Sequence, residues 1–210
     1  MLRDIVRKET QIIAARDVIA DVNPDILVLS DFDYDADGRA LTAFAATLAK
    51  AGADVVLNSF TDNEEDHKLA SDMSEEFGVS VTYIKADMSK ADECRALIDK
   101  AGKCDILVNN AGIQFVKGID EFPVEKWDAI IAINLSSAFH TTAVALPMMR
   151  KAGWGRVINI ASAHGLTASP FKSAYIAAKH GVVGLSKTMA LETAREPITC
   201  NAICPGYVLT

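Results

Sequence analysis

Short apolar runs alternate with longer amphipathic stretches along most of this 210-residue chain. The short runs are rich in Val, Ile and Leu, as in strands that are buried on both faces of a sheet. The longer stretches repeat their apolar residues at helical spacing, and a glycine follows four of them where a helix C-cap is expected. We therefore expect strands at 26–30, 54–58, 80–84, 105–108, 156–160 and 198–203, helices at 39–51, 64–77, 90–100, 124–151 and 173–196, N-caps at Thr61 and Ser89, and C-caps at Gly52, Gly78, Gly102 and Gly153.

This alternation of strand and helix predicts βαβ units, and so an α/β fold with a doubly wound, Rossmann-like parallel sheet of about six strands. Residues 1–22 carry a polar, amphipathic pattern ahead of the first strand, which predicts an extra N-terminal helix. We expect this helix to be an appendage to one domain spanning 23–210. The chain ends just after the sixth expected strand, so that strand is expected to have an unpaired outer edge.

Composition narrows the class of protein. Apolar residues make up 50% of the chain and charged residues 23%, which is ordinary for a globular domain and excludes a disordered one. The formal net charge is −7 without any basic block, so we expect no nucleic-acid partner. The N-terminus lacks the apolar core of a secretory signal, and the uncharged stretch 129–149 contains too many polar groups for lipid, so we expect a cytoplasmic protein without a membrane partner. The four cysteines lack zinc-ligand spacing, and no metal site is expected from them.

The candidate chemistry follows the fourth and fifth expected strands, because ligands of open parallel sheets bind beyond the carboxyl ends of the strands. After residue 108 come two asparagines, an alanine and a glycine, small residues and amides that suit a flat ligand. Ser162 and His164 follow residue 160, and Tyr175 and Lys179 then lie four residues apart on one helix face. A phenol has a pKa of about 10, which a nearby cation lowers toward the range useful for proton transfer. The pattern predicts that Ser162 binds a carbonyl or alcohol oxygen while Tyr175 transfers the proton.

Taken in order, these residues resemble the short-chain dehydrogenase/reductase family over about residues 51–210. The resemblance rests on Asn109-Asn110-Ala111-Gly112, Asn134, Ser162, Tyr175-x-x-x-Lys179 and Pro205-Gly206. It implies that Tyr175 is the catalytic acid/base, that Ser162 polarises the substrate oxygen and that Asn134 holds a water in a proton relay. It also implies that Lys179 binds the nicotinamide ribose and tunes Tyr175. The NAD-binding residues that it implies are Asp87, Asn109, Ala111, Gly112, Tyr175, Lys179, Pro205, Gly206, Val208 and Thr210.

Three longer stretches narrow the resemblance to the branch of the family that interconverts 3-hydroxybutyrate and acetoacetate. They read IQFV, FPVEKWDAIIAINLSSAFH and IASAHGLTASPFKSAYIAAKHGVVGLSK. The substrate implied is a small hydroxy or keto acid, with Lys172 as the charge partner of its carboxylate. Gln114, His164 and Tyr207 complete the implied substrate site, and Tyr207 stands where the branch has a Trp. The helices expected at 124–151 and 173–196 resemble the family's dimer-forming pair, which implies a homo-oligomer. The family also continues past the position of Thr210, through a substrate lid and a final edge strand, so the domain is expected to be truncated there.

The loop after the first expected strand departs from the family. It reads DFDYDADG over Asp31–Gly38, where the family has a glycine-rich turn that receives the cofactor pyrophosphate. A like charge beside the pyrophosphate costs on the order of 1 kcal/mol per close pair, which predicts weak or absent NAD affinity.

This departure leaves three hypotheses open. The chain is an NAD-dependent dehydrogenase, or a non-catalytic or chimeric derivative that acts at most as a binding or assembly module, or a protein that binds a divalent metal through residues 31–37. Asp33-x-Asp35-x-Asp37-Gly38 matches the first half of an EF-hand loop, but Leu41 and Phe44 stand at the two remaining side-chain ligand positions, so a solvated acidic turn is favoured. Residues 12–50 are also similar to part of the endonuclease/exonuclease/phosphatase-type hydrolases.

Overall fold

The computed structural model describes residues 26–30 and 39–206, with side chains from Ala45 onward. The helix expected at 1–22 and the acidic loop Asp31–Gly38 lie outside the described residues. So do three of the expected site residues, Tyr207, Val208 and Thr210.

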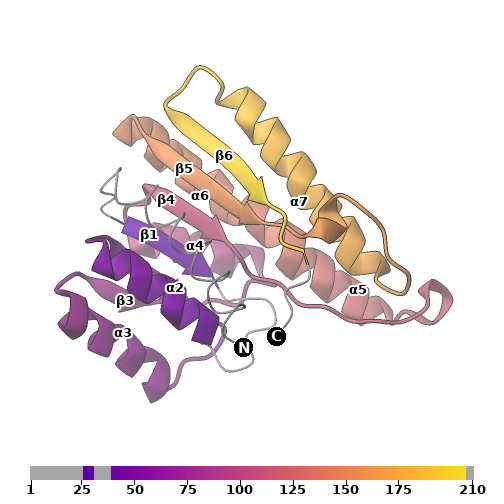
Figure 1. Ribbon diagram of the computed structural model, residues 1–210, viewed down its shortest axis with the longest axis horizontal. Helices are drawn as coiled ribbons and strands as arrows, with labels where there is room; N and C mark the ends of the chain where they lie inside the picture. The colour runs from indigo at the N-terminus through magenta and orange to yellow at the C-terminus, as the bar shows by residue number, and fades with distance from the viewer. Residues whose placement is uncertain (1–25, 31–38, 207–210) are drawn as a thin grey trace.

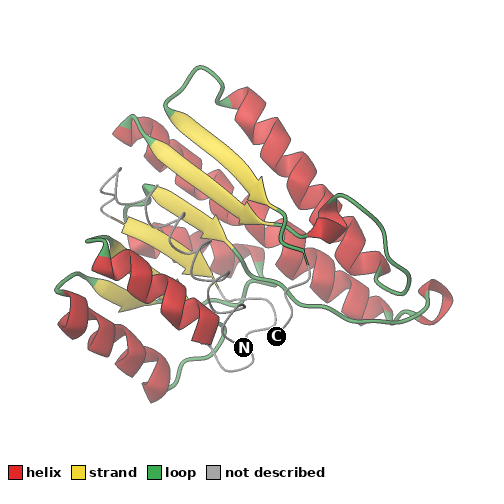
Figure 2. Ribbon diagram, viewed as in Figure 1, coloured by secondary structure: helices red, strands yellow, loops and turns green. Residues whose placement is uncertain are grey.

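The described strands form one six-stranded parallel sheet in the order β3-β2-β1-β4-β5-β6 (Figures 1 and 2). This confirms the expected α/β fold with a doubly wound sheet. The strand order reverses between β1 and β4, which is the place where open parallel sheets bind their ligands. The strands are β1 (Ile26–Ser30), β2 (Asp54–Asn58), β3 (Val81–Tyr83), β4 (Ile106–Asn109), β5 (Gly155–Ile160) and β6 (Ile198–Ile203).

Six α-helices are described, and most begin and end within two residues of the positions expected. They are α2 (Arg39–Lys50), α3 (Glu64–Phe77), α4 (Ala91–Ala101), α5 (Val124–Ile131), α6 (Ser137–Ala152) and α7 (Ser173–Glu192). The single helix expected at 124–151 is interrupted by a π-helical turn, η2 (Ala132–Ser136). Helix α7 ends four residues earlier than expected, at Glu192.

The expected N-caps were both wrong, whereas three of the C-cap glycines are confirmed. Asn63, not Thr61, caps α3, and it forms a capping box with Asp66. Lys90, not Ser89, precedes α4, because the Ser89 hydroxyl donates to the Asp87 carboxylate instead. Glycines 78, 102 and 153 end their helices with positive φ, and Gly52 also has a positive φ just after α2.

Helices cover both faces of the sheet. Neighbouring residues of each strand point to opposite faces, so they pack against different helices. Val55, Leu57, Ile106 and Val108 pack with residues of α2 and α3. The alternate positions, Val56, Leu107 and Val157 among them, pack with residues of α4, α6 and α7. Burial on both sides explains why the strand sequences are continuous apolar runs.

The stretch Val124–Ala152 is long and apolar enough to cross a membrane by length and composition, but it packs within this domain. Its α6 part contacts α4, β4 and β5, and its α5 and η2 parts contact α7. The expected burial is only partly met, because 39% of the most apolar part of this stretch is buried and Val124 and Phe139 are exposed. At one edge of the sheet, β6 pairs with β5 alone among the described strands.

Candidate active site

Three of the four expected catalytic residues, Ser162, Tyr175 and Lys179, lie on two segments next to the carboxyl end of β5. Ser162 follows this strand and caps the short 3-10 helix η3 (Ala163–Gly165). Helix α7 packs directly on η3 and carries Tyr175 and Lys179 in its first two turns. The amide N–H of Ala163 donates to the carbonyl of Pro205 at 2.8 Å, which places the segment after β6 against the same short helix.

Tyr175 and Lys179 form a buried pair on α7. Lys179 is 1% exposed and Tyr175 is 6% exposed. The Lys179 Nζ lies 5.5 Å from the centroid of the Tyr175 ring and donates a 2.8 Å hydrogen bond to the Ile160 carbonyl at the end of β5. A charged side chain is rarely buried so deeply, and here one of its donors is anchored to the sheet. The ammonium is thus held at a fixed position beside the phenol ring.

The His164 ring contacts the same tyrosine from η3, and Ser162 caps this short helix. The Ser162 Oγ accepts a 3.1 Å hydrogen bond from the His164 amide N–H. The His164 ring meets the Tyr175 ring edge-to-face, with 6.1 Å between their centroids. Burial lowers the pKa of His164, and the positive charge of Lys172 lowers it further, so the imidazole is neutral at neutral pH.

Asn134 sits in the π-helical turn η2, and its amide is fully paired with the backbone after β4. The Asn134 Oδ1 accepts from the Ile113 N–H at 2.8 Å, and its Nδ2 donates to the Ile113 carbonyl at 2.9 Å. Asn134 is 3% exposed. The side chain therefore fixes the loop that follows Gly112 and is a satisfied buried amide, while its place in a water relay stays a prediction. Turns of this π type are frequent at functional sites.

The side chain of Asn109 belongs to a buried network between strands and helices. Its Nδ2 donates to Asn159 Oδ1 at 2.8 Å and to Thr142 Oγ1 at 3.2 Å, and its Oδ1 accepts from Thr141 Oγ1 at 2.7 Å. Asn159 continues the network by donating to Ser186 Oγ at 2.9 Å. The Asn109 amide therefore joins β4 to β5 and α6, while its contact with a cofactor stays a prediction.

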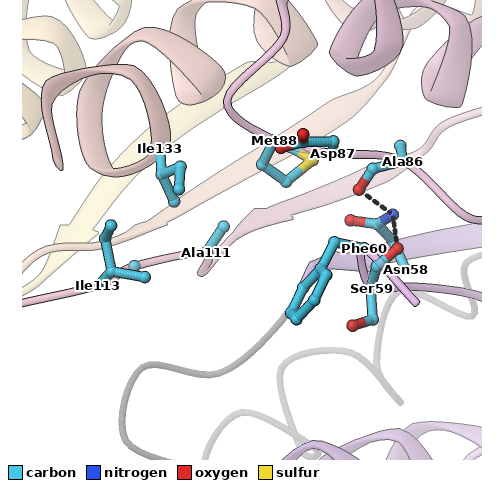
Figure 3. Close-up of a pocket in the computed structure, with 10 residues that line it drawn as sticks. Asn58, Ser59, Phe60, Ala86, Asp87, Met88, Ala111, Ile113 and Ile133 are labelled. Atoms are coloured by element: carbon cyan, nitrogen blue, oxygen red, sulfur yellow. Dashed lines mark hydrogen bonds between the residues drawn. The ribbon is translucent and has the colours of Figure 1, made fainter. Parts of the chain in front are cut away.

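A cavity of about 100 Å³ opens next to the carboxyl ends of β2 and β4 (Figure 3). Three of the expected cofactor-binding residues, Asp87, Ala111 and Gly112, line it. The Asn58 Oδ1 is buried and has no hydrogen-bond partner among the described residues, while its Nδ2 donates to the Ala86 carbonyl at 3.2 Å. The sequence motifs did not indicate the remaining lining residues, although three of them end or follow the strand expected at 54–58. These residues are Asn58, Ser59, Phe60, Ala86, Met88, Ile113 and Ile133.

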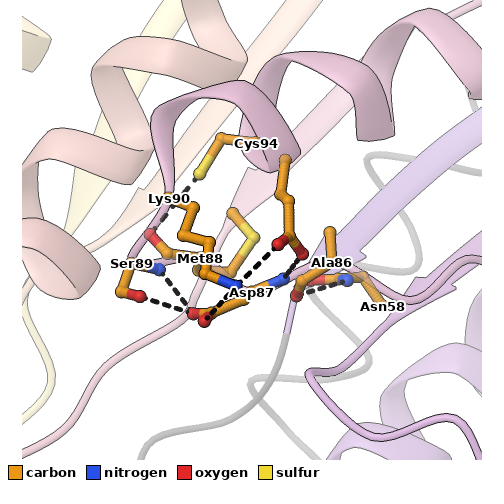
Figure 4. Close-up of polar contacts among 8 residues, drawn as sticks. Asn58, Ala86, Asp87, Met88, Ser89, Lys90 and Cys94 are labelled. Atoms are coloured by element: carbon orange, nitrogen blue, oxygen red, sulfur yellow. Dashed lines mark hydrogen bonds and ion pairs between the residues drawn. The ribbon is translucent and has the colours of Figure 1, made fainter.

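Asp87 is held in place by the residues that begin α4 (Figure 4). Its Oδ1 accepts from the Ser89 hydroxyl at 2.7 Å and from the Ser89 N–H at 2.9 Å, while the Lys90 Nζ lies 3.4 Å from Oδ2. These hydrogen bonds, with the Ser89 hydroxyl first, lower the pKa of Asp87, so the cavity has an ionised carboxylate in its wall. The contact of Asp87 with an adenine ring stays a prediction.

The side chain of Asn134 and one backbone hydrogen bond hold the loops that contain the expected substrate residues. Gln114 follows Ile113, which Asn134 fixes, and the Lys117 N–H donates to the Phe171 carbonyl at 2.9 Å. Lys172 is half-buried and precedes α7 directly. The structure thus connects the loop of Gln114 to the loop of Lys172 next to Tyr175.

The described residues contain no group of three or more His, Cys, Asp or Glu side chains that could hold a metal ion. The residues of the third hypothesis, 31–37, lie outside this part of the chain.

Comparisons with known proteins agree with this geometry. The family model described as short chain dehydrogenase matches residues 41–210. The D-beta-hydroxybutyrate dehydrogenase of Rhizobium meliloti is 58% identical over 172 residues, which cover 80% of this chain and 67% of that protein. The protein of the same name from Cupriavidus necator is 56% identical over 170 residues, covering 79% and 65%. This chain therefore spans about two thirds of the length of these relatives.

Among solved structures, the acetoin dehydrogenase of Salmonella typhimurium superposes with a TM-score of 0.76 at 33% identity, covering 87% of this chain and 72% of that one. The comparisons lend no support to the hydrolase resemblance of residues 12–50. Because the family model matches residues 41–210, which is most of the chain, the chain belongs to the short-chain dehydrogenase/reductase family.

Proposed function

We propose that the chain is an NAD-dependent oxidoreductase that interconverts 3-hydroxybutyrate and acetoacetate, and that it works in the cytoplasm as a homo-oligomer. The observation that carries this proposal is the meeting of Ser162, Tyr175 and Lys179 at the end of β5. The names of the two relatives above support the choice of substrate.

In the proposed reaction, Tyr175 takes the proton of the substrate hydroxyl during oxidation and returns it during reduction. The buried Lys179 ammonium beside the ring favours the phenolate that accepts this proton. The Ser162 hydroxyl donates a hydrogen bond to the substrate oxygen, and its position is set by the η3 turn that it caps. His164, neutral at neutral pH, packs on the tyrosine without adding charge there.

Lys172 and Gln114 account for the choice of a small carboxylic acid. Lys172 provides a cation directly before the helix that carries Tyr175. Gln114 provides an amide on the neighbouring loop, which is bonded to the loop of Lys172 through Lys117 and Phe171. A carboxylate paired with an ammonium gains a charge-assisted hydrogen bond, which an uncharged alcohol does not make.

The residues around the cavity fit the adenosine half of NAD. Ala111 and Gly112 present backbone without bulky side chains, and the Asn58 Oδ1, which has no partner among the described residues, is an acceptor for a ligand donor. NAD, when bound, exchanges a hydride with the substrate carbon. None of the described residues that line the cavity is Lys or Arg, and the ionised Asp87 repels a further phosphate, which supports NAD over NADP.

A second candidate function is a non-catalytic or chimeric derivative that acts as a binding or assembly module. The observation that favours it is the sequence Asp31–Gly38, in which four aspartates occupy the place of the glycine-rich turn. The choice between the two therefore depends on whether NAD binds.

Isothermal titration of the 210-residue chain with NADH tests this choice directly. Saturable binding in the micromolar range is expected if the dehydrogenase proposal is correct, followed by NADH formation when 3-hydroxybutyrate and NAD are added. The variant Tyr175→Phe is the control, and it should abolish this activity while circular dichroism shows the parent fold. An absence of binding up to millimolar NADH would refute the proposal for this chain.

The variant Asp31→Ala/Asp33→Ala/Asp35→Ala separates the remaining hypotheses. Under the derivative hypothesis it should leave NADH affinity unchanged or increase it, because like charges leave the pyrophosphate site. If residues 31–37 bind a metal instead, the same variant should lose any stabilisation of the parent chain by divalent cations.

A further inference from the structure

Phe171 is the only non-glycine residue in the described part of the chain with a positive φ, at 66°. A bulky side chain is strained in this left-handed region, because its Cβ comes too close to the backbone. The ring gives little in return, since Phe171 is 61% exposed. Strained backbone persists only where surrounding contacts impose it, and it is concentrated at functional sites.

The contacts that impose this conformation lie in the loop of Gln114. The Phe171 carbonyl accepts a 2.9 Å hydrogen bond from the Lys117 N–H, three residues after Gln114. The Lys117 side chain is itself paired with Glu121 at 2.7 Å. The turn at Phe171 is therefore bonded to the loop that contains Gln114, one of the expected substrate residues.

Lys172, the next residue, is fixed from both sides. Its N-terminal neighbour is the bonded, left-handed Phe171, and its own carbonyl accepts from the Ile176 N–H at 2.9 Å as the first bond of α7. Extended backbone at Phe171 would rotate the peptide that joins it to Lys172 and turn its carbonyl away from Lys117. The start of the Lys172 side chain would move with that peptide.

We propose that the left-handed turn at Phe171, locked by the Lys117 amide, positions the Lys172 ammonium for the carboxylate of the substrate. Phe171 is thus a positioning residue that acts through its backbone conformation and not through its ring. This inference rests on the proposed function, because it assigns the carboxylate of that substrate to Lys172.

Two variants that both remove the ring separate backbone from side chain. Asparagine tolerates the left-handed region, whereas β-branched valine disfavours it strongly. We expect Phe171→Val to raise the KM for 3-hydroxybutyrate by about tenfold, which is the loss of one charge-assisted hydrogen bond, with kcat changed by less than about twofold. We expect Phe171→Asn to stay within about twofold of the parent in both constants.

The methyl ester of 3-hydroxybutyrate is the matched control substrate, because it lacks the negative charge. Its KM should be the same in the parent, Phe171→Val and Phe171→Asn. An equal rise of the 3-hydroxybutyrate KM in both variants would assign the effect to the ring and overturn the proposal. So would an unchanged KM in Phe171→Val, or an equal rise for acid and ester.

A titration of His164 by NMR tests the positioning without cofactor or turnover. The Lys172 charge contributes to the lowered pKa of His164, so a displaced Lys172 should let that pKa rise. We expect Phe171→Val to move the pKa toward the value of the Lys172→Gln variant, and Phe171→Asn to keep the parent value. A parent chain that binds no NADH would refute the proposed function, whereas equal His164 titrations in parent and Phe171→Val would refute the positioning alone. Phe171→Thr repeats the β-branched change with a polar side chain if Phe171→Val does not fold.

Discussion

Replacing Asn109 by aspartate tests whether its side chain belongs to the core or to the cofactor site. The change keeps the size of the side chain but turns the donor Nδ2 into an oxygen. That oxygen would face Asn159 Oδ1, now 2.8 Å from Nδ2, and Thr142 Oγ1, now 3.2 Å from it. The bond accepted from Thr141 Oγ1 would remain.

The magnitude follows from the loss of the hydrogen bond to Asn159, whose Oδ1 can only accept, whereas the Thr142 hydroxyl can turn and donate to the new oxygen. Asn109 is 8% exposed and Asn159 is 1% exposed, so water does not replace the lost donor. A hydrogen bond lost while its partner stays buried costs about 1–3 kcal/mol, and the carboxylate is itself desolvated, so we expect a loss of about 3 kcal/mol in the free energy of unfolding. For a chain of this length, that corresponds to a Tm lower by roughly 6–12 °C.

Urea unfolding followed by circular dichroism measures this difference, with Asn201→Asp as the matched control. Asn201 is exposed on β6, and the same change there should stay within about 0.5 kcal/mol of the parent. Burial raises the pKa of the introduced carboxyl above its unfolded value. The deficit should therefore be small in acid, grow as the pH rises from the unfolded pKa through the folded one, and be complete above it.

The opposite pattern would refute the reasoning. If Asn109→Asp unfolds like Asn201→Asp and NADH binding falls instead, the Asn109 side chain faces the cofactor and the network seen here does not stabilise the fold.

Three further predictions follow from the packing and the pKa shifts. In Gly165→Ala the new Cβ would lie 2.8 Å from a backbone carbonyl of α7, so we expect thermal unfolding to show a stability loss above about 1 kcal/mol. In the control Gly184→Ala the new Cβ meets nothing within 4 Å, so this variant should gain about 0.5–1 kcal/mol of stability. Ser89→Ala removes the main cause of the lowered Asp87 pKa, so its stability deficit should be present at neutral pH and disappear as the pH falls through that lowered pKa in a series of urea titrations. A thiol reagent should modify Cys204, which is only partly buried, quickly in the native chain, and the other three cysteines only on unfolding. Burial raises the thiol pKa to about 11 in Cys94, about 12 in Cys104 and about 11 in Cys200.

Local patterns were enough to place the strands and most helices, since a buried parallel strand requires a continuous apolar run. They failed at the N-caps, because only the structure shows which polar side chain reaches the free N–H groups. Asn63 does so for α3, whereas the Ser89 hydroxyl is taken by Asp87. The π-turn around Asn134 also escaped the helical period, because it is tied to Ile113, which is 21 residues away in the chain.

The rule that ligands bind beyond strand ends found the residues after β4 and β5, and applied to β2 it would also have found Ser59 and Phe60. It did not show that Asn109 is the last residue of β4, directly opposite Asn159 of β5. The side-chain direction of a residue at a strand end depends on that register, which is a property of two strands together.

The sequence by itself determined the order of the elements and the pairing of Tyr175 with Lys179, because four residues along a helix always share one face. Only the tertiary structure decided which polar groups serve the site and which serve the core. It assigned Asn109 to a network across β4, β5 and α6, and it placed Asp87 in the wall of the cavity. It also imposed the left-handed turn at Phe171 through a hydrogen bond from Lys117. Each of these outcomes depends on contacts between segments far apart in the chain, which no local pattern records.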